Sequence, residues 1–236
     1  MYEPHEALKI PSDDARVWRY MDIGKFVSLL STSALFFCRL DRLRDPYEGL
    51  PNSLTVEDWK HYECSEGELG RLYAASRLWT YANSWHLNEF ESAAMWELYL
   101  KTTEGIAVET TVGRLRESFS AEQTQKVFIG TVNYIDYETE PVPWRNGFSL
   151  ALHKRQSFAH EQELRALVWL LVNLDTDTKV APPEGVNVRV DLTHLIRKVF
   201  VSPSAGAWYV DVVTALLEKF GYAAIPVVQS RLYSLK

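Results

Sequence analysis

The sequence predicts an α+β fold, a single domain in which a mixed, mainly antiparallel, twisted sheet is flanked by helices. The chain has 236 residues, of which 47% are hydrophobic and 24% charged, as in globular proteins with a core of their own. Short β-rich segments alternate irregularly with amphipathic segments. No repeat, low-complexity run or change of composition marks a linker. We therefore expect an N-terminal arm over residues 1–16 and one domain over residues 17–236.

The first elements follow from local signals. Residues 17–20 are short and aromatic, as in a strand, and Asp22 is a suitable N-cap for a helix whose apolar residues recur at helical spacing. Residues 35–38 predict a second strand. Residues 39–51 combine three arginines with Asp, Pro and Gly and predict a shaped loop.

The middle of the chain predicts helices and further strands. Residues 55–77 have helical spacing, with Thr55 and Asp58 in the register of a weak capping box. Residues 79–87 predict a strand in which Trp79, Tyr81, Asn83 and Trp85 share one face. A helix over 91–101 and a strand over 106–109 follow.

The second half has the same mixed character. Strands are expected over 127–135, 186–190, 199–201 and 225–228, and residues 141–143 predict a loop. Residues 163–171 fit either a strand or a buried helix, because periodicity does not separate the two. Asp191 caps a short helix over 191–196, and Gly221 ends a helix over 207–220.

Charge and cysteine content restrict the function classes. The net charge of −6 disfavours indiscriminate binding to nucleic acid or to an anionic membrane, although a local basic groove remains possible. Cys38 and Cys64 match no zinc spacing, and no apolar run approaches the roughly 20 residues that cross a bilayer. We expect a cytoplasmic protein with reduced thiols, no bound metal and no membrane association. The sequence contains no GxGxxG, Walker, GxSxG or HExxH motif.

The segment 154–165 carries the strongest chemical pattern, with four basic and two acidic residues beside an apolar run. In an extended chain, Glu161, Glu163 and Arg165 share one face, with the two carboxylates about 7 Å apart. Neighbouring carboxylates raise each other's pKa, whereas the arginine favours their ionised forms. The alternative is a solvated, charged strand edge without chemistry.

Two other groups of residues are candidates. In the loop, Arg39, Arg42 and Arg44 have the geometry to bind phosphate or carboxylate, or to pair with the neighbouring Asp41, Asp45 and Glu48. Trp79, Tyr81, Trp85 and Trp96 offer flat surfaces for a nucleobase or nicotinamide, but such residues also fill cores.

The chain resembles a bacterial family described as domain of unknown function 2971, from about residue 17 to 232. The matching segments follow the family's order: Trp18-Arg19-Tyr20; Asp45-Pro46-Tyr47-Glu48-Gly49; Met95-Trp96-Glu97-Leu98-Tyr99, followed by Gly105-Ile106-Ala107-Val108-Glu109; and Glu161-Gln162-Glu163-Leu164-Arg165. The chain departs from the pattern at Arg44, where the family usually has asparagine, and at Phe158, where a larger aromatic is common.

The layout of this family is similar to the ADP-ribosyltransferase fold, and the resemblance implies NAD as the substrate. Arg19 and Tyr20 would then hold the dinucleotide, and Ser84 and Trp85 would shape the nicotinamide pocket. Glu163 would stabilise charge on the ribose and Glu161 would activate the acceptor, with further substrate contacts from Arg42, Asp45 and Trp96. The resemblance further implies a role in phage defence or as a toxin, with a protein or nucleic-acid acceptor.

Two alternatives remain at this point. The first is a non-enzymatic binding or regulatory module in which Glu161, Glu163 and Arg165 form an ion-pair lattice that stabilises the sheet. The second is a nuclease that uses the loop from Arg39 to Asp45, which the net charge disfavours. The sequence determines neither the acceptor nor the oligomeric state.

Overall fold

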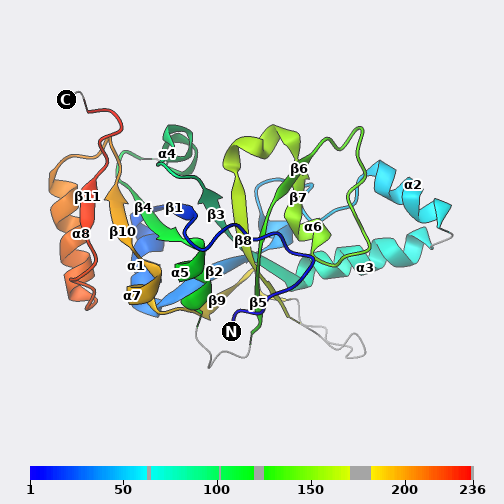
Figure 1. Cartoon of the computed structure of the whole chain (residues 1–236), viewed down its shortest axis with the longest axis horizontal. Helices are drawn as coiled ribbons and strands as arrows, with labels where there is room; N and C mark the ends of the chain where they lie inside the picture. Colours follow the sequence, from blue (N-terminus) through cyan, green and yellow to red (C-terminus); the bar gives the residue numbers. More distant parts are fainter. Residues whose placement is uncertain (63–64, 101, 120–124, 171–181, 235–236) are drawn as a thin grey trace. The chain divides into compact units, whose positions relative to one another are not determined.

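The computed structural model describes all residues except 63–64, 101, 120–124, 171–181 and 235–236 (Figure 1). Its fold is α+β, with a mixed, mainly antiparallel sheet and flanking helices, which confirms the predicted class. The chain forms two compact units. The first contains Met1–Ile10, Phe36–Ser84 and Thr124–Asn187, and the second contains Pro11–Leu35, Trp85–Gln123 and Val188–Lys236. Strands β2 (Ala34–Arg39), β3 (Thr80–Leu87) and β9 (Gly185–Arg189) are each divided between them.

The second unit is built on β1 (Arg16–Asp22), which pairs antiparallel with β4 (Gly105–Thr111) along its whole length. β10 (Lys198–Val201) lies antiparallel to β4, and β11 (Val227–Gln229) lies parallel to β10. The side chain of Asp22 accepts a hydrogen bond from the backbone N–H of Lys25 and starts helix α1, as predicted. The helices of this unit are α1 (Ile23–Thr32), α4 (Ala93–Tyr99), α5 (Val112–Glu117), α7 (Leu192–Leu195) and α8 (Trp208–Lys219).

In the first unit, β8 (Glu163–Trp169) lies between β3 and β5 (Val127–Thr131), and β5 runs antiparallel to it. A separate parallel pair is formed by β6 (Asn133–Ile135) and β7 (His153–Arg155). The helices of this unit are η1 (Leu40–Arg42), α2 (Ser53–His61), α3 (Glu66–Trp79), α6 (Ser149–Leu152) and η2 (Gln156–Glu161).

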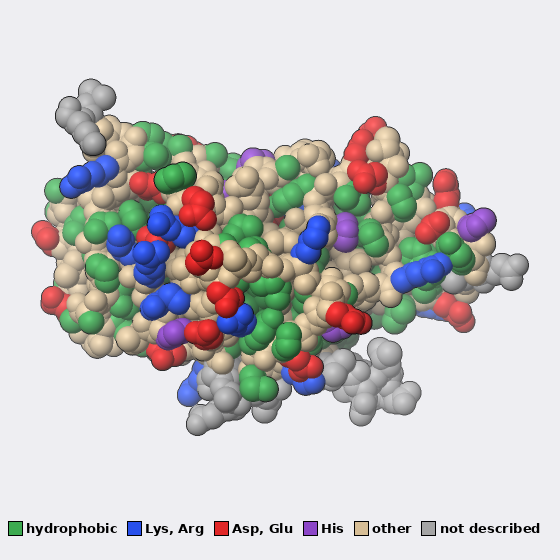
Figure 2. Space-filling model, viewed as in Figure 1, with side chains coloured by type: hydrophobic (Ala, Val, Ile, Leu, Met, Phe, Trp, Pro, Cys, Tyr) green, Lys and Arg blue, Asp and Glu red, His purple; other side chains and the backbone are tan. Residues whose placement is uncertain are grey.

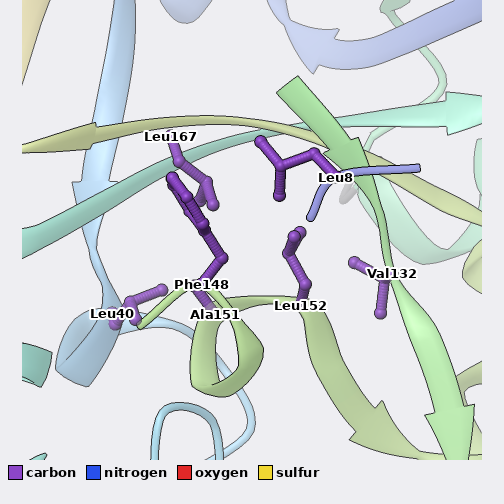
Figure 3. Packing of buried hydrophobic residues seen from close by; sticks show 8 residues of the cluster. Leu8, Leu40, Val132, Phe148, Ala151, Leu152 and Leu167 are labelled. Carbon is purple, nitrogen blue, oxygen red and sulfur yellow. The ribbon is translucent and has the colours of Figure 1, made fainter. Parts of the chain in front are cut away.

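Figure 3 shows the hydrophobic cluster around which the first unit packs. The N-terminal residues take part in it, because Leu8 lies within the cluster and the backbone carbonyl of Lys9 accepts a hydrogen bond from Thr131. Tyr2 forms a parallel bridge with Val127. The cluster consists of Leu8, Leu40, Ala82, Val132, Phe148, Ala151, Leu152 and Leu167.

Several element boundaries differ from prediction. Residues 127–135 form two strands instead of one, because the backbone N–H of Val132 donates to the carbonyl of Glu163 and β6 then pairs with β7. Trp79 ends helix α3 instead of starting a strand. The apolar run from residue 163 is a strand, and residues 171–181 lie outside the described chain.

On the face of the molecule in Figure 2, acidic and basic side chains are interspersed.

Helix α2 is capped by Asn52 and not by Thr55. The side-chain oxygen of Asn52 accepts hydrogen bonds from the N–H and the hydroxyl of Thr55, at 3.0 and 2.7 Å. Its amide group donates to the carbonyls of Tyr137 and Glu140, at 3.0 and 2.7 Å. Asn52 therefore both starts the helix and attaches it to the loop that follows β6.

We expect Asn52→Ala to lower the free energy of unfolding by about 2 kcal/mol, because it removes the cap and leaves two carbonyls without their donor. Ser65→Ala is the matched control, since Ser65 caps α3 through one hydrogen bond of 3.3 Å, and it should cost about 0.5–1 kcal/mol. Urea unfolding monitored by tryptophan fluorescence measures both. Equal losses would show that the loop contacts of Asn52 add nothing.

Candidate functional site

The strongest concentration of charge in the first unit is an ionic cluster of five residues, Glu48, Lys154, Glu161, Glu163 and Arg165. Lys154 is in β7, Glu161 ends η2, and Glu163 and Arg165 are in β8. Glu48 comes from the loop between η1 and α2. Four separate segments of the chain therefore contribute to one cluster.

Lys154 is the centre of the ionic cluster. Its ammonium group lies 3.0 Å from Glu48, 2.5 Å from Glu161 and 2.9 Å from Glu163. All three of its donor hydrogens therefore have a carboxylate partner.

Arg165 forms the other half of the ionic cluster. Its Nε and Nη2 atoms donate to the two oxygens of Glu163, at 2.8 and 3.0 Å. Its Nη1 atom lies 2.6 Å from Glu48 and donates to the carbonyl of Ala151. The side chains of Arg165 and Glu163 are only 1% and 4% exposed. A charge removed from water to this extent is stable only when it is paired, as it is here.

An unusual turn brings the two sequence-predicted carboxylates together. Gln162, which lies between them, has φ +42°, in the left-handed region that side chains other than glycine seldom adopt. The chain reverses there between η2 and β8. The extended geometry considered for residues 161–165 does not hold at Glu161, which ends a 3-10 helix, and the strand begins at Glu163. Glu161 and Glu163 nevertheless meet at Lys154.

The charges of the ionic cluster do not balance, because three carboxylates surround two cations. Burial acts to raise the pKa of Glu163, but the charge and hydrogen bonds of Arg165 outweigh it, and the pKa lies well below its ordinary value. Burial, followed by the hydrogen bond to Glu163, raises the pKa of Glu161 to about 7. The raised pKa makes Glu161 the carboxyl group of the ionic cluster that takes up a proton near neutral pH, and its side chain is 14% exposed.

The loop residues predicted to bind substrate are engaged in ion pairs. Asp45 is buried and accepts hydrogen bonds from Arg155 at 2.8 and 3.2 Å. Arg155 also lies 4.4 Å from the ring centre of Tyr47 and 5.3 Å from that of Phe158. Arg42 pairs with Glu184 and lies 3.9 Å from Asp41. The expected pairing with neighbours in the loop holds for Arg39, which lies 2.5 Å from Asp41, whereas Asp45 and Arg42 have their shortest ion pairs with residues outside the loop.

Sequence reasoning missed several residues of the site. Tyr134 accepts a hydrogen bond from the N–H of Glu163, and burial, followed by the charge of Glu163, raises its pKa. Burial, followed by the charge of Glu48, raises the pKa of Tyr137 to about 12. Glu48 and Lys154 belong to segments that the sequence singled out, but nothing local indicated that they meet.

Arg19 and Tyr20, which were assigned to the dinucleotide, lie on opposite faces of β1 in the second unit. Arg19 lies 5.9 Å from the ring centre of Trp85. Tyr20, as the next residue in the strand, points to the other face, where its ring packs edge to face against Trp96 at 4.9 Å. Burial raises the pKa of Tyr20, and its hydroxyl accepts a hydrogen bond from Ser92. Ser84 belongs to the first unit, as do Glu161 and Glu163.

Comparison of the chain with family models, curated proteins and solved structures finds no match. Within the part of the chain that the structure describes, no helix has the length and apolar character to cross a membrane. No three histidine, cysteine, aspartate or glutamate side chains among those residues are grouped to hold a metal ion.

We expect Glu163→Gln to lower the free energy of unfolding by roughly 3–5 kcal/mol, because Arg165 and Lys154 remain buried without one of their carboxylates. Glu68→Gln, at an exposed position of α3 in the same unit, should change it by less than about 0.5 kcal/mol. Guanidinium unfolding measures both variants. A Glu163→Gln protein as stable as Glu68→Gln would contradict a stabilising ionic cluster.

At high pH, Glu161→Gln should raise the free energy of unfolding relative to wild type, whereas Glu163→Gln should lower it. Because the folded-state pKa of Glu161 is raised from 4.5 to about 7, its contribution to stability is fully present below pH 4.5 and is lost as the pH rises through 7. Glutamine stays neutral throughout. We therefore expect the stability of Glu161→Gln relative to wild type to increase by about 3 kcal/mol between pH 4.5 and 8.5 in urea titrations. A difference that does not change with pH would contradict the shifted pKa.

Proposed function

We propose that the protein is an ADP-ribosyltransferase-like enzyme that cleaves the nicotinamide–ribose bond of NAD and transfers ADP-ribose to an acceptor. In this proposal Glu161 is the carboxylate that takes the proton of the acceptor. The observation that carries it is the position of Glu161 at the edge of the ionic cluster, with a side chain 14% exposed beside the fully buried Glu163. The resemblance of the sequence to the domain 2971 family supplies NAD as the substrate.

Glu161 has the properties that a general base needs near neutral pH. A pKa of about 7 leaves a substantial fraction ionised at pH 7, and this carboxylate is basic enough to accept a proton. Lys154 and Glu163 fix its carboxylate by direct contact. Groups with perturbed pKa values and fixed partners occur frequently at catalytic sites.

The proposed reaction balances as follows. The bond between ribose C1′ and the nicotinamide nitrogen breaks, and its electron pair leaves with neutral nicotinamide. A bond forms between C1′ and the acceptor atom, whose proton passes to the carboxylate of Glu161. Positive charge develops on the ribose in the transition state, as in glycoside cleavage, and nearby negative charge lowers that barrier.

The proposal changes the role of Glu163 relative to the expectation from sequence. Both oxygens of Glu163 are bound by Arg165, and one also by Lys154. Glu163 therefore acts as a positioning residue that fixes Lys154, which in turn holds Glu161. Arg19 and Trp85 keep the role of dinucleotide contacts that the resemblance gives them.

The experiment measures NAD turnover and NAD binding separately. With NAD labelled in the nicotinamide ring and, in a parallel sample, in the adenine, we expect wild type to release nicotinamide and to label an acceptor. Glu161→Gln should lower both rates by about 100-fold or more without changing the Kd for NAD. Arg19→Ala should weaken NAD binding. Equal rates for wild type and Glu161→Gln, or no turnover by wild type, would contradict the proposal.

The second candidate is a non-enzymatic binding module, and the complete pairing of Glu163 and Arg165 favours it. In that case the ionic cluster only stabilises the first unit. Wild type would then release no nicotinamide across candidate acceptors, while Glu163→Gln would still be strongly destabilised. Turnover that depends on Glu161 excludes this candidate.

A further inference from the structure

A cavity of about 460 Å³ lies in the second unit, and none of the residues assigned to NAD chemistry above lines it, although Trp96 donates a hydrogen bond to Glu91 of the lining. It is lined by Glu91, Lys198, Phe200, Val228, Gln229 and Arg231. β10 and β11 form its floor, because Phe200 and Val228 are directly paired in the parallel ladder. Its volume is within the range of small-molecule sites.

The cavity presents positive charge. Among the described residues, neither Lys198 nor Arg231 forms an ion pair with a carboxylate. Glu91, the acidic residue of the lining, accepts a hydrogen bond from the indole N–H of Trp96. Two cations beside one carboxylate leave a net positive site, which favours an anionic ligand.

The cavity also presents a flat apolar surface. The Phe200 ring is half-buried and rests against Trp18 at 5.1 Å, so its position is fixed from behind. The ammonium group of Lys198 lies 5.5 Å from the ring centre. Charge and aromatic surface are therefore adjacent, as a ligand with a charged group on a flat ring requires.

We infer that this cavity binds a small anion that carries a flat ring, the chemistry of a nucleoside monophosphate. The phosphate would pair with Lys198 and Arg231, and the base would stack on Phe200. The site is distinct from the proposed transferase reaction and does not depend on it.

The test is calorimetric titration of the full chain with four probes: adenosine 5′-monophosphate, adenosine, benzoate and inorganic phosphate. We expect saturable one-to-one binding of the monophosphate and weaker binding of the other three, because adenosine lacks the phosphate, inorganic phosphate lacks the nucleobase and benzoate lacks both. Phosphate binding as tightly as the monophosphate, or no binding of the monophosphate at millimolar concentration, would overturn the inference.

Variants assign the binding to this cavity. The double variant Lys198→Gln with Arg231→Gln should weaken monophosphate binding by about 100-fold, ten-fold for each charged contact, while Lys219→Gln on the exposed end of α8 leaves it unchanged. An unchanged affinity in the double variant would overturn the inference. Nicotinamide release measured on the same variant should equal wild type, so failure of this site and failure of the transferase proposal are distinguishable.

Discussion

The buried guanidinium of Arg165 is the constraint on which the first unit depends. An arginine that is 1% exposed requires fixed carboxylates, and Glu48 and Glu163 provide them from a loop and from the same strand. Lys154 then bridges the same two carboxylates to Glu161. The loop after η1, strand β7, helix η2 and strand β8 are thereby held in one arrangement. Gln162, with its positive φ, ends η2 and leads into β8 between the two carboxylates that meet at Lys154.

The same arrangement gives two neighbouring carboxylates different properties. Glu163 is ionised and bound on both oxygens, so its energetic effect is on folding. Glu161 has a raised pKa and lies closer to solvent. In the proposed reaction, Glu163 therefore stabilises the fold and positions Lys154, while Glu161 takes the proton of the acceptor.

The elements that could be predicted from sequence are those with local causes. Asp22, Asp191 and Gly221 mark helix ends because a cap acts within a few residues. The strand from Glu163 stayed ambiguous because a buried apolar run has no period of its own. The pairing of Glu48 with Lys154 could not be predicted for a different reason. The two residues are far apart in the chain, and a single sequence carries no information on such pairings. The segments that carry the resemblance, 45–49 and 161–165, both contribute residues to buried ion pairs, and the sequence did not show that Glu48 of the first meets Glu163 and Arg165 of the second at Lys154.

The central claim is that one exchangeable proton of the ionic cluster resides on Glu161 while Glu163 stays ionised. Carbon-detected NMR of the side-chain carboxyl groups, in protein labelled with ¹³C at the glutamate δ position, measures this directly, with Glu161→Gln and Glu163→Gln spectra for assignment. The account predicts a resonance of Glu161 that titrates near pH 7 and a resonance of Glu163 that does not move down to about pH 4. Titration of Glu161 near 4.5, or of both carboxyl groups together in the ordinary range, would contradict it.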